Sequence, residues 1–128
     1  MQNRDIYISA LRLIGEVAEN NDDYMERAPY LLAAFCTESA ETDIAYRREH
    51  SLDPRPRVSS VCIPLDTDFP CADRFATAAA SYIAAMLVID ENAELSDRLF
   101  DRYCDIMATI QSEIPSRIEK IVDRYGAF

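Results

Sequence analysis

Three aspartates in the second half of the chain form its most regular array of chemically active side chains. Asp97, Asp101 and Asp105 stand four residues apart, so on a helix they make one acidic column. Paired carboxylates can act as general acid and base or bind a divalent cation, but both roles need groups from other helices. We therefore expect a solvated face, helped by the pair Glu94 and Arg98, and keep a metal-dependent enzyme as a third hypothesis.

The thiols and the single imidazole show no site pattern. The chain has four cysteines, Cys36, Cys62, Cys71 and Cys104, and no two of them form a CxxC pair. Three of the four lie among apolar neighbours, as reduced buried thiols do. His50 follows Glu49 without a matching ligand spacing, which predicts a surface residue near a helix end. A Cys-His or Ser-His catalytic arrangement would have to use this same histidine. We expect no catalytic residue, no metal and no cofactor.

Composition excludes several classes of protein. The two glycines, Gly15 and Gly126, are too few for a glycine-rich phosphate loop. A net charge of -10 argues against binding nucleic acid by phosphate neutralisation, so we expect no sequence-specific nucleic-acid binding. No apolar run reaches the roughly 18 residues of a membrane span, and the first residues do not form an export signal. We therefore expect no membrane association.

The densest basic region follows the middle of the chain. Arg47 and Arg48 precede Arg55 and Arg57, which lie on a connection stiffened by proline. These arginines could pair with an acidic partner, including the acidic surface of another copy of the chain. An ordinary solvated loop fits the same residues equally well.

Apolar residues at three- and four-residue steps predict the elements that carry these groups. We expect helices over 3–19, 23–50, 69–89 and 92–110, with Asp66 or Asp68 capping the third and a further short segment after Pro115. Pro54 and Pro56 bar a helix, and residues 58–63 alternate as a short strand or hairpin arm would. The third helix is rich in alanine and apolar on most sides over 72–89, so it is central in the domain or becomes central only after assembly. The sequence thus predicts one all-α domain over 1–128, with four to five helices around a central Ala-rich helix.

Several phrases resemble one family of virion proteins. PLDTDFPCADRF, then an alanine-rich helix, IDENAELSDRLFDRYCDIM and a short C-terminal helix, is similar to the small head-tail connector (adaptor) proteins of tailed phages and prophages. The opening ISALRLIGE is similar to starts in the same group. The resemblance implies a helical subunit in a ring between portal and tail, without enzyme activity. The chain departs from the pattern because it lacks glycine in the loop between the second and third helices. This departure also fits another morphogenetic role, such as tail completion.

In such connectors this loop lies against a neighbouring subunit or the channel. The resemblance therefore implies five interface candidates: Arg55, Arg57, Val58, Val61 and Ile63. The expected function is a non-enzymatic structural subunit that self-associates, with a ring as one form, and binds portal and tail proteins. Contacts between basic and acidic surfaces, with burial of the Ala-rich helix, would supply the interface. The expected location is the cytoplasm during assembly and then the virion; the alternative is a small cytoplasmic helical adaptor or regulator that binds another protein.

Overall fold

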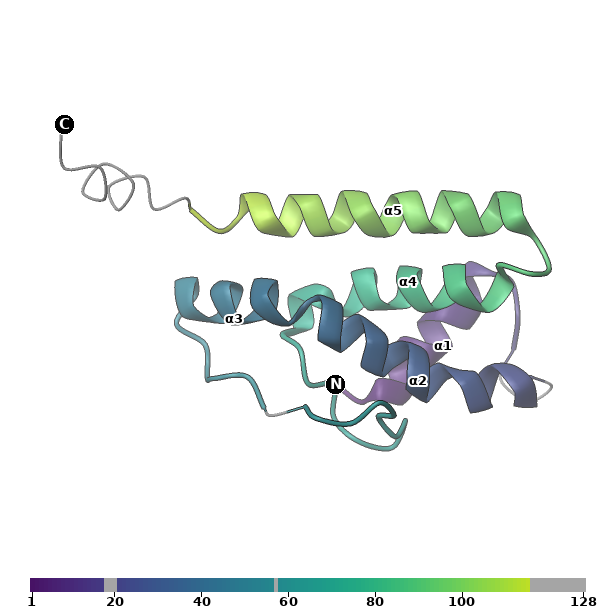
Figure 1. Ribbon diagram of the computed structural model, residues 1–128, viewed down its shortest axis with the longest axis horizontal. Helices are drawn as coiled ribbons and strands as arrows, with labels where there is room; N and C mark the ends of the chain where they lie inside the picture. Colours follow the sequence, from purple (N-terminus) through teal and green to yellow (C-terminus); the bar gives the residue numbers. More distant parts are fainter. Residues whose placement is uncertain (18–20, 57, 116–128) are drawn as a thin grey trace, which may run out of the picture.

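The computed structural model describes residues 1–17, 21–56 and 58–115, which form five α-helices and one short 3₁₀-helix (Figure 1). In chain order the elements are α1 (Asn3–Leu13), α2 (Asp22–Glu38), α3 (Ala40–Glu49), η2 (Asp73–Phe75), α4 (Ala76–Val88) and α5 (Ala93–Ser112). The predicted all-α class is confirmed. The expected segment after Pro115 lies outside the described residues.

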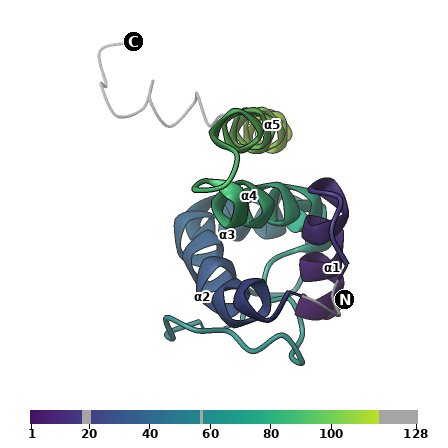
Figure 2. The ribbon, with the colours of Figure 1, turned by 90° about the vertical axis from the view of Figure 1, so that its right-hand side faces the viewer.

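Helix α4 is the centre of the fold. It packs against α1, α2 and α5, and its alanines from Ala78 to Ala80 and at Ala84 and Ala85 are buried. An alanine side chain ends at Cβ, so neighbouring helices can approach α4 closely, and Figure 2 shows α1, α2 and α4 around one core with α5 outside. The prediction of a central Ala-rich helix is confirmed. Because α4 is already covered within one chain, the expectation that its burial supplies an interface between copies is wrong.

Helix α5 forms an outer layer that lies along α4 (Figures 1 and 2). The side chain of Asn92 accepts a hydrogen bond from the backbone N–H of Leu95 at 3.1 Å, which caps the start of the helix as the sequence predicts. Leu99 and Ile110 are buried. The Ser96 hydroxyl donates to the Ala85 carbonyl at 2.8 Å. One face of α5 is thus fixed to α4, and the other faces outward.

The first helix is shorter than its apolar spacing suggests. It ends at Leu13, and Gly15 follows with φ +74°, a left-handed conformation that favours glycine. The N–H of Glu16 then bonds to the Leu11 carbonyl at 2.9 Å, which closes the helix end in the manner of a Schellman motif. The glycine, rather than the polar run after it, stops the helix.

The helix predicted over 23–50 is divided at Ser39. Helix α2 ends at Glu38 and α3 begins at Ala40, although the Ser39 N–H still bonds to the Phe35 carbonyl at 2.9 Å. Ser39 itself is buried. The change of direction sets α3 apart from the line of α2 (Figure 1), and it carries the polar site described below.

The predicted strand or hairpin over 58–63 is wrong, since the described residues contain no strand. The segment is an irregular coil whose Ile63 N–H bonds to the Pro29 carbonyl at 3.1 Å, in helix α2. A local turn replaces strand pairing, because the Ser60 hydroxyl donates to the Cys62 carbonyl at 2.8 Å and accepts from the Cys62 N–H at 3.1 Å. The alternation of side chains was present, but no second strand lies beside it to complete a ladder.

Within the described ranges, every helix falls short of the length and apolar character that a membrane crossing demands. Tyr24 of α2 is buried, and its hydroxyl donates a hydrogen bond to Glu91 in the elbow between α4 and α5. Burial and then this hydrogen bond raise the pKa of Tyr24 to about 12.

Candidate functional site: a basic pocket on a buried ion-pair cluster

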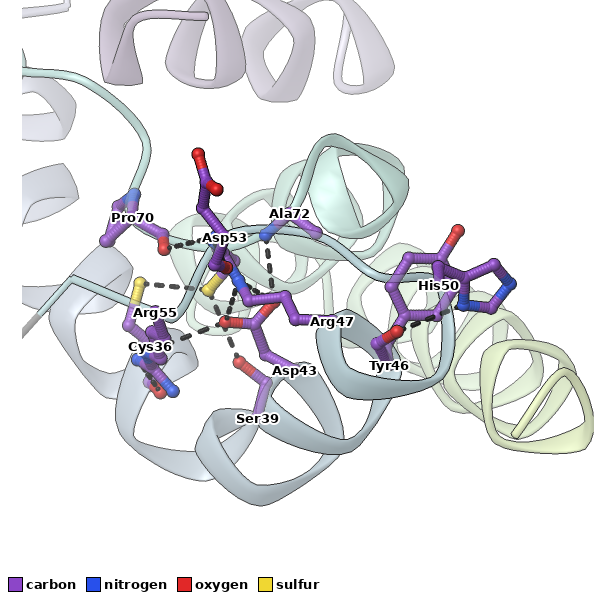
Figure 3. Close-up of polar contacts among 11 residues, drawn as sticks. Cys36, Ser39, Asp43, Tyr46, Arg47, His50, Asp53, Arg55, Pro70 and Ala72 are labelled. Carbon is purple, nitrogen blue, oxygen red and sulfur yellow. Dashed lines mark hydrogen bonds and ion pairs between the residues drawn. The ribbon is translucent and has the colours of Figure 1, made fainter. Parts of the chain in front are cut away.

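The site is built on the carboxylate of Asp43, which is 0% exposed although it belongs to the short polar helix α3 (Figure 3). Its oxygens accept hydrogen bonds from Arg47 Nε at 3.2 Å and from the backbone N–H of Ala72 at 2.9 Å. Arg55 Nε lies 3.7 Å from Oδ2. A buried carboxylate is tolerated only with such partners, and here donors approach both oxygens.

The two arginines extend this cluster to the surrounding chain. Arg47 donates to the carbonyls of Asp53 and Pro70, each at 3.0 Å, and Arg55 Nη2 donates to the Cys36 carbonyl at 2.7 Å. The end of α2, helix α3 and two coil segments are therefore joined at one point. This network holds in place the proline-stiffened coil that the sequence predicts as a loose connection.

A pair of thiols lies beside the cluster. The Sγ atoms of Cys36 and Cys71 are 3.6 Å apart, both residues are buried, and the Ser39 hydroxyl is 3.7 Å from Cys71 Sγ. The contact with Cys71, followed by burial, raises the pKa of the Cys36 thiol. Cys36 is therefore protonated at neutral pH and is not prepared as a nucleophile.

A pocket of about 750 Å³ opens between the end of α2, helix α3 and the coil residues at 52–56 and 58. Most of its lining is apolar, and three arginines contribute to it. The full lining is Cys36, Thr37, Ala40, Ile44, Arg47, Arg48, Leu52, Pro54, Arg55, Pro56 and Val58. Arg47 and Arg55 share the charge of Asp43, whereas Arg48 is exposed. An apolar surface with excess positive charge suits a partner that carries both a hydrophobic group and carboxylates.

The five predicted interface residues are separated by the structure. Arg55 has a side chain that is only 8% exposed, and Val58 is half-buried; both line the pocket. Val61 is 80% exposed, whereas Ile63 is 8% exposed and belongs to the hydrophobic core. Arg57 lies outside the described residues. Arg55 and Val58 therefore share a site, while Val61 lies further along the chain and projects into solvent.

The residue that organises the site, Asp43, was missed by the sequence analysis. The one sequence feature that pointed to an ion pair there was the i,i+4 spacing of Asp43 and Arg47, and such spacing is common on solvated helices. The polar second half of the predicted helix over 23–50 suggested exposure for both. Only the packing of the coil against α3 shows that the carboxylate is enclosed.

The other groups that the sequence singled out lie apart from the pocket. Asp97, Asp101 and Asp105 are all exposed on α5, beside a surface ion pair of 3.2 Å between Glu94 and Arg98. Across the part of the chain that the structure describes, no three histidine, cysteine or acidic residues are placed to hold a metal ion.

The histidine and the thiols lie largely as expected. His50 is exposed just after α3, as predicted, with its ring stacked on Tyr46 at 4.1 Å between centroids (Figure 3). All four cysteines are free; Cys36 and Cys71 are buried, Cys62 is half-buried, and Cys104 is exposed on α5.

In this arrangement the cluster anchors the surrounding chain. The Asp43 carboxylate is occupied by donors. In the nearby thiol pair, the mutual contact raises the pKa of Cys36 and lowers the pKa of Cys71. Comparison with known proteins adds no assignment, since neither a protein-family model, nor a curated protein, nor a solved structure matches the chain.

Proposed function

We propose that this chain is a non-enzymatic structural subunit of a tailed-phage or prophage particle, a head-tail connector that assembles with copies of itself and with portal and tail proteins. In this proposal the subunit is cytoplasmic during assembly and then becomes part of the virion. The phrases from Pro64 to Phe75 and from Ile89 to Met107 give the family resemblance. The ordering of the coil and the charge of the chain support this role.

The observation that carries the proposal is a coil fixed in place by a fully buried carboxylate. Ordering an irregular segment costs about 1–2 kcal/mol per residue in backbone entropy. Enclosing Asp43, which is 0% exposed, adds a desolvation cost. This ordering supports a role in which another protein recognises the shape of the coil. Val61 lies in the following segment over 58–63, which the Ile63 N–H ties to the Pro29 carbonyl, and it is 80% exposed, so it offers an apolar contact to such a partner.

The charge of the chain fits the same role. A net charge of -10 suits a subunit that lies near a DNA channel without holding the DNA. The arginines of the pocket and the acidic face of α5 provide surfaces of opposite sign for contacts between proteins.

Co-expression with the portal and tail proteins from the same genome region tests the proposal. We expect the full chain to co-purify with a tagged portal or tail protein, and Val61→Asp to weaken retention. Val17→Asp is the matched control, because Val17 is also exposed but follows α1, outside the coil. Loss of the chain from every such complex contradicts the proposal.

The alternative is a small cytoplasmic helical adaptor or regulator, which the pocket of about 750 Å³ favours because it suits a segment of a host protein. Gene order separates the two functions. Terminase, portal and capsid genes beside this one favour the connector, and their absence favours the adaptor.

A further inference from the structure

The basic pocket has more positive charge than its own residues neutralise. Three arginines line it, and Asp43 pairs with Arg47 and Arg55. Arg48 is exposed and has no ion pair with any residue that the structure describes. The remaining lining is apolar, from Ile44 and Leu52 to the prolines of the coil. A matching occupant needs a hydrophobic group with carboxylates beside it.

The outward face of α5 has this combination. Asp97, Asp101 and Asp105 are exposed along one column, and none forms an ion pair within the described ranges. Phe100 lies next to this column and is 39% exposed, although phenylalanine is usually enclosed. Phe100 follows Asp97 by three residues, so the spacing places it beside Asp97 on the flank of this column.

The two surfaces cannot meet within one molecule. The coil that walls the pocket lies on the opposite side of the fold from α5, as both ribbon views show (Figures 1 and 2). Any contact between them must therefore join two copies of the chain.

We infer that the acidic face of α5 in one copy docks into the basic pocket of the next copy. In this contact Phe100 lies against the apolar lining, and Asp97 and Asp101 face Arg48. The inference rests on the self-association in the proposed function and names the surfaces that perform it. Because each copy uses two different surfaces, the interface is heterologous and gives a ring or an open chain rather than a closed dimer.

Complementation between two charge variants tests this contact. Arg48→Glu disables the pocket but keeps α5, and Asp101→Arg disables α5 but keeps the pocket. In sedimentation velocity at low salt, the full-length wild-type chain should form species larger than dimers. Each variant alone should associate roughly tenfold or more weakly, because like charges then face each other. An equal mixture of the two should recover association, since the intact α5 face of one variant meets the intact pocket of the other.

Two matched controls should associate as the wild type does: Arg12→Glu on α1 and Asp90→Arg in the elbow, both exposed and outside the two surfaces. The inference is overturned if the wild type stays monomeric at all concentrations, if Arg48→Glu associates normally, or if the mixture fails to pair. It is also overturned if only a free apolar carboxylate such as decanoate binds the pocket, seen as thermal stabilisation that Arg48→Glu removes.

The proposed function has a separate readout. A monomeric chain that still co-purifies with the portal protein overturns this contact and leaves the connector role standing. If the two variants complement each other but the chain binds no portal or tail protein, the contact between copies stands and the connector role is overturned.

Discussion

Arg55 Nε lies 3.7 Å from the Oδ2 atom of Asp43, twelve residues away in the sequence. This ion pair joins a proline-stiffened coil to helix α3. Arg47, four residues after Asp43 on that helix, forms a second ion pair in which its Nε lies 3.2 Å from the same oxygen. The contact turns a segment with no secondary structure into a fixed wall of a pocket. The stability of that wall can be tested directly.

Replacing Asp43 with asparagine removes the charge while keeping the shape of the side chain. Arg55 then stays enclosed without a counter-charge, so we expect the free energy of unfolding to fall by about 3–5 kcal/mol. Urea unfolding followed by circular dichroism measures the change. Glu41→Gln, an exposed neutralisation on the same helix, should change it by less than about 0.5 kcal/mol. Equal unfolding midpoints for the two variants would show that Asp43 does not anchor the coil.

The cysteines should differ sharply in reactivity toward a disulfide reagent such as DTNB. Cys104 is exposed and should react first, while Cys36 and Cys71 are buried and should react only after unfolding. The raised pKa of Cys36 slows its reaction further, since the thiolate is the reactive form. Cys104→Ser should remove the fastest phase. Rapid reaction of Cys36 in the folded chain would contradict the packing around the site.

Stability should fall at alkaline pH through Tyr24. Its pKa rises from 10.0 to about 12 on folding, first through burial and then through the hydrogen bond to Glu91. The folded state therefore holds the phenol proton more tightly than the unfolded state does. This contribution is fully present below pH 10 and is lost as the pH rises from 10 to about 12. Urea unfolding across this range should show a smaller loss for Tyr24→Phe than for the wild type, and equal losses would refute the assignment.

Enlarging the small residues of α4 should disturb the centre of the fold. Ala84 is fully buried, so Ala84→Leu forces extra volume into a packed interface and should cost about 1–3 kcal/mol. Ala93→Leu at the exposed start of α5 is the control and should stay within about 0.5 kcal/mol. Thermal unfolding distinguishes them. A stabilised Ala84→Leu would mean that α4 has unfilled space beside it.

The sequence predicted the helices that have strong apolar spacing and missed the features set by packing. The Ala-rich run before Val88 and the Asn92 cap were sufficient to place the body of α4 and the start of α5. The helical turn expected over 69–71 is wrong, since the first helical residues there are Asp73–Phe75. The break at Ser39 was not visible, because the residues on both sides keep helical spacing and the buried position of Ser39 depends on contacts far along the chain. Alternation alone could not predict whether residues 58–63 would find a strand partner.

The site was predictable only in part. The arginine-rich region was recognised, and Arg55 and Val58 do line one pocket. The burial of Asp43 was not, since an aspartate and an arginine four residues apart usually lie in solvent. Its enclosure requires the Ala72 backbone, 29 residues away, which donates to the carboxylate at 2.9 Å. Contacts of this range follow from the tertiary fold rather than from local spacing.

Electron microscopy of the full chain mixed with its neighbouring portal protein tests the central claim most directly. The connector proposal predicts added density at one end of the portal ring, with copies of the chain joined from the α5 face to the pocket. Portal rings without added density, while the chain sediments separately, would contradict it.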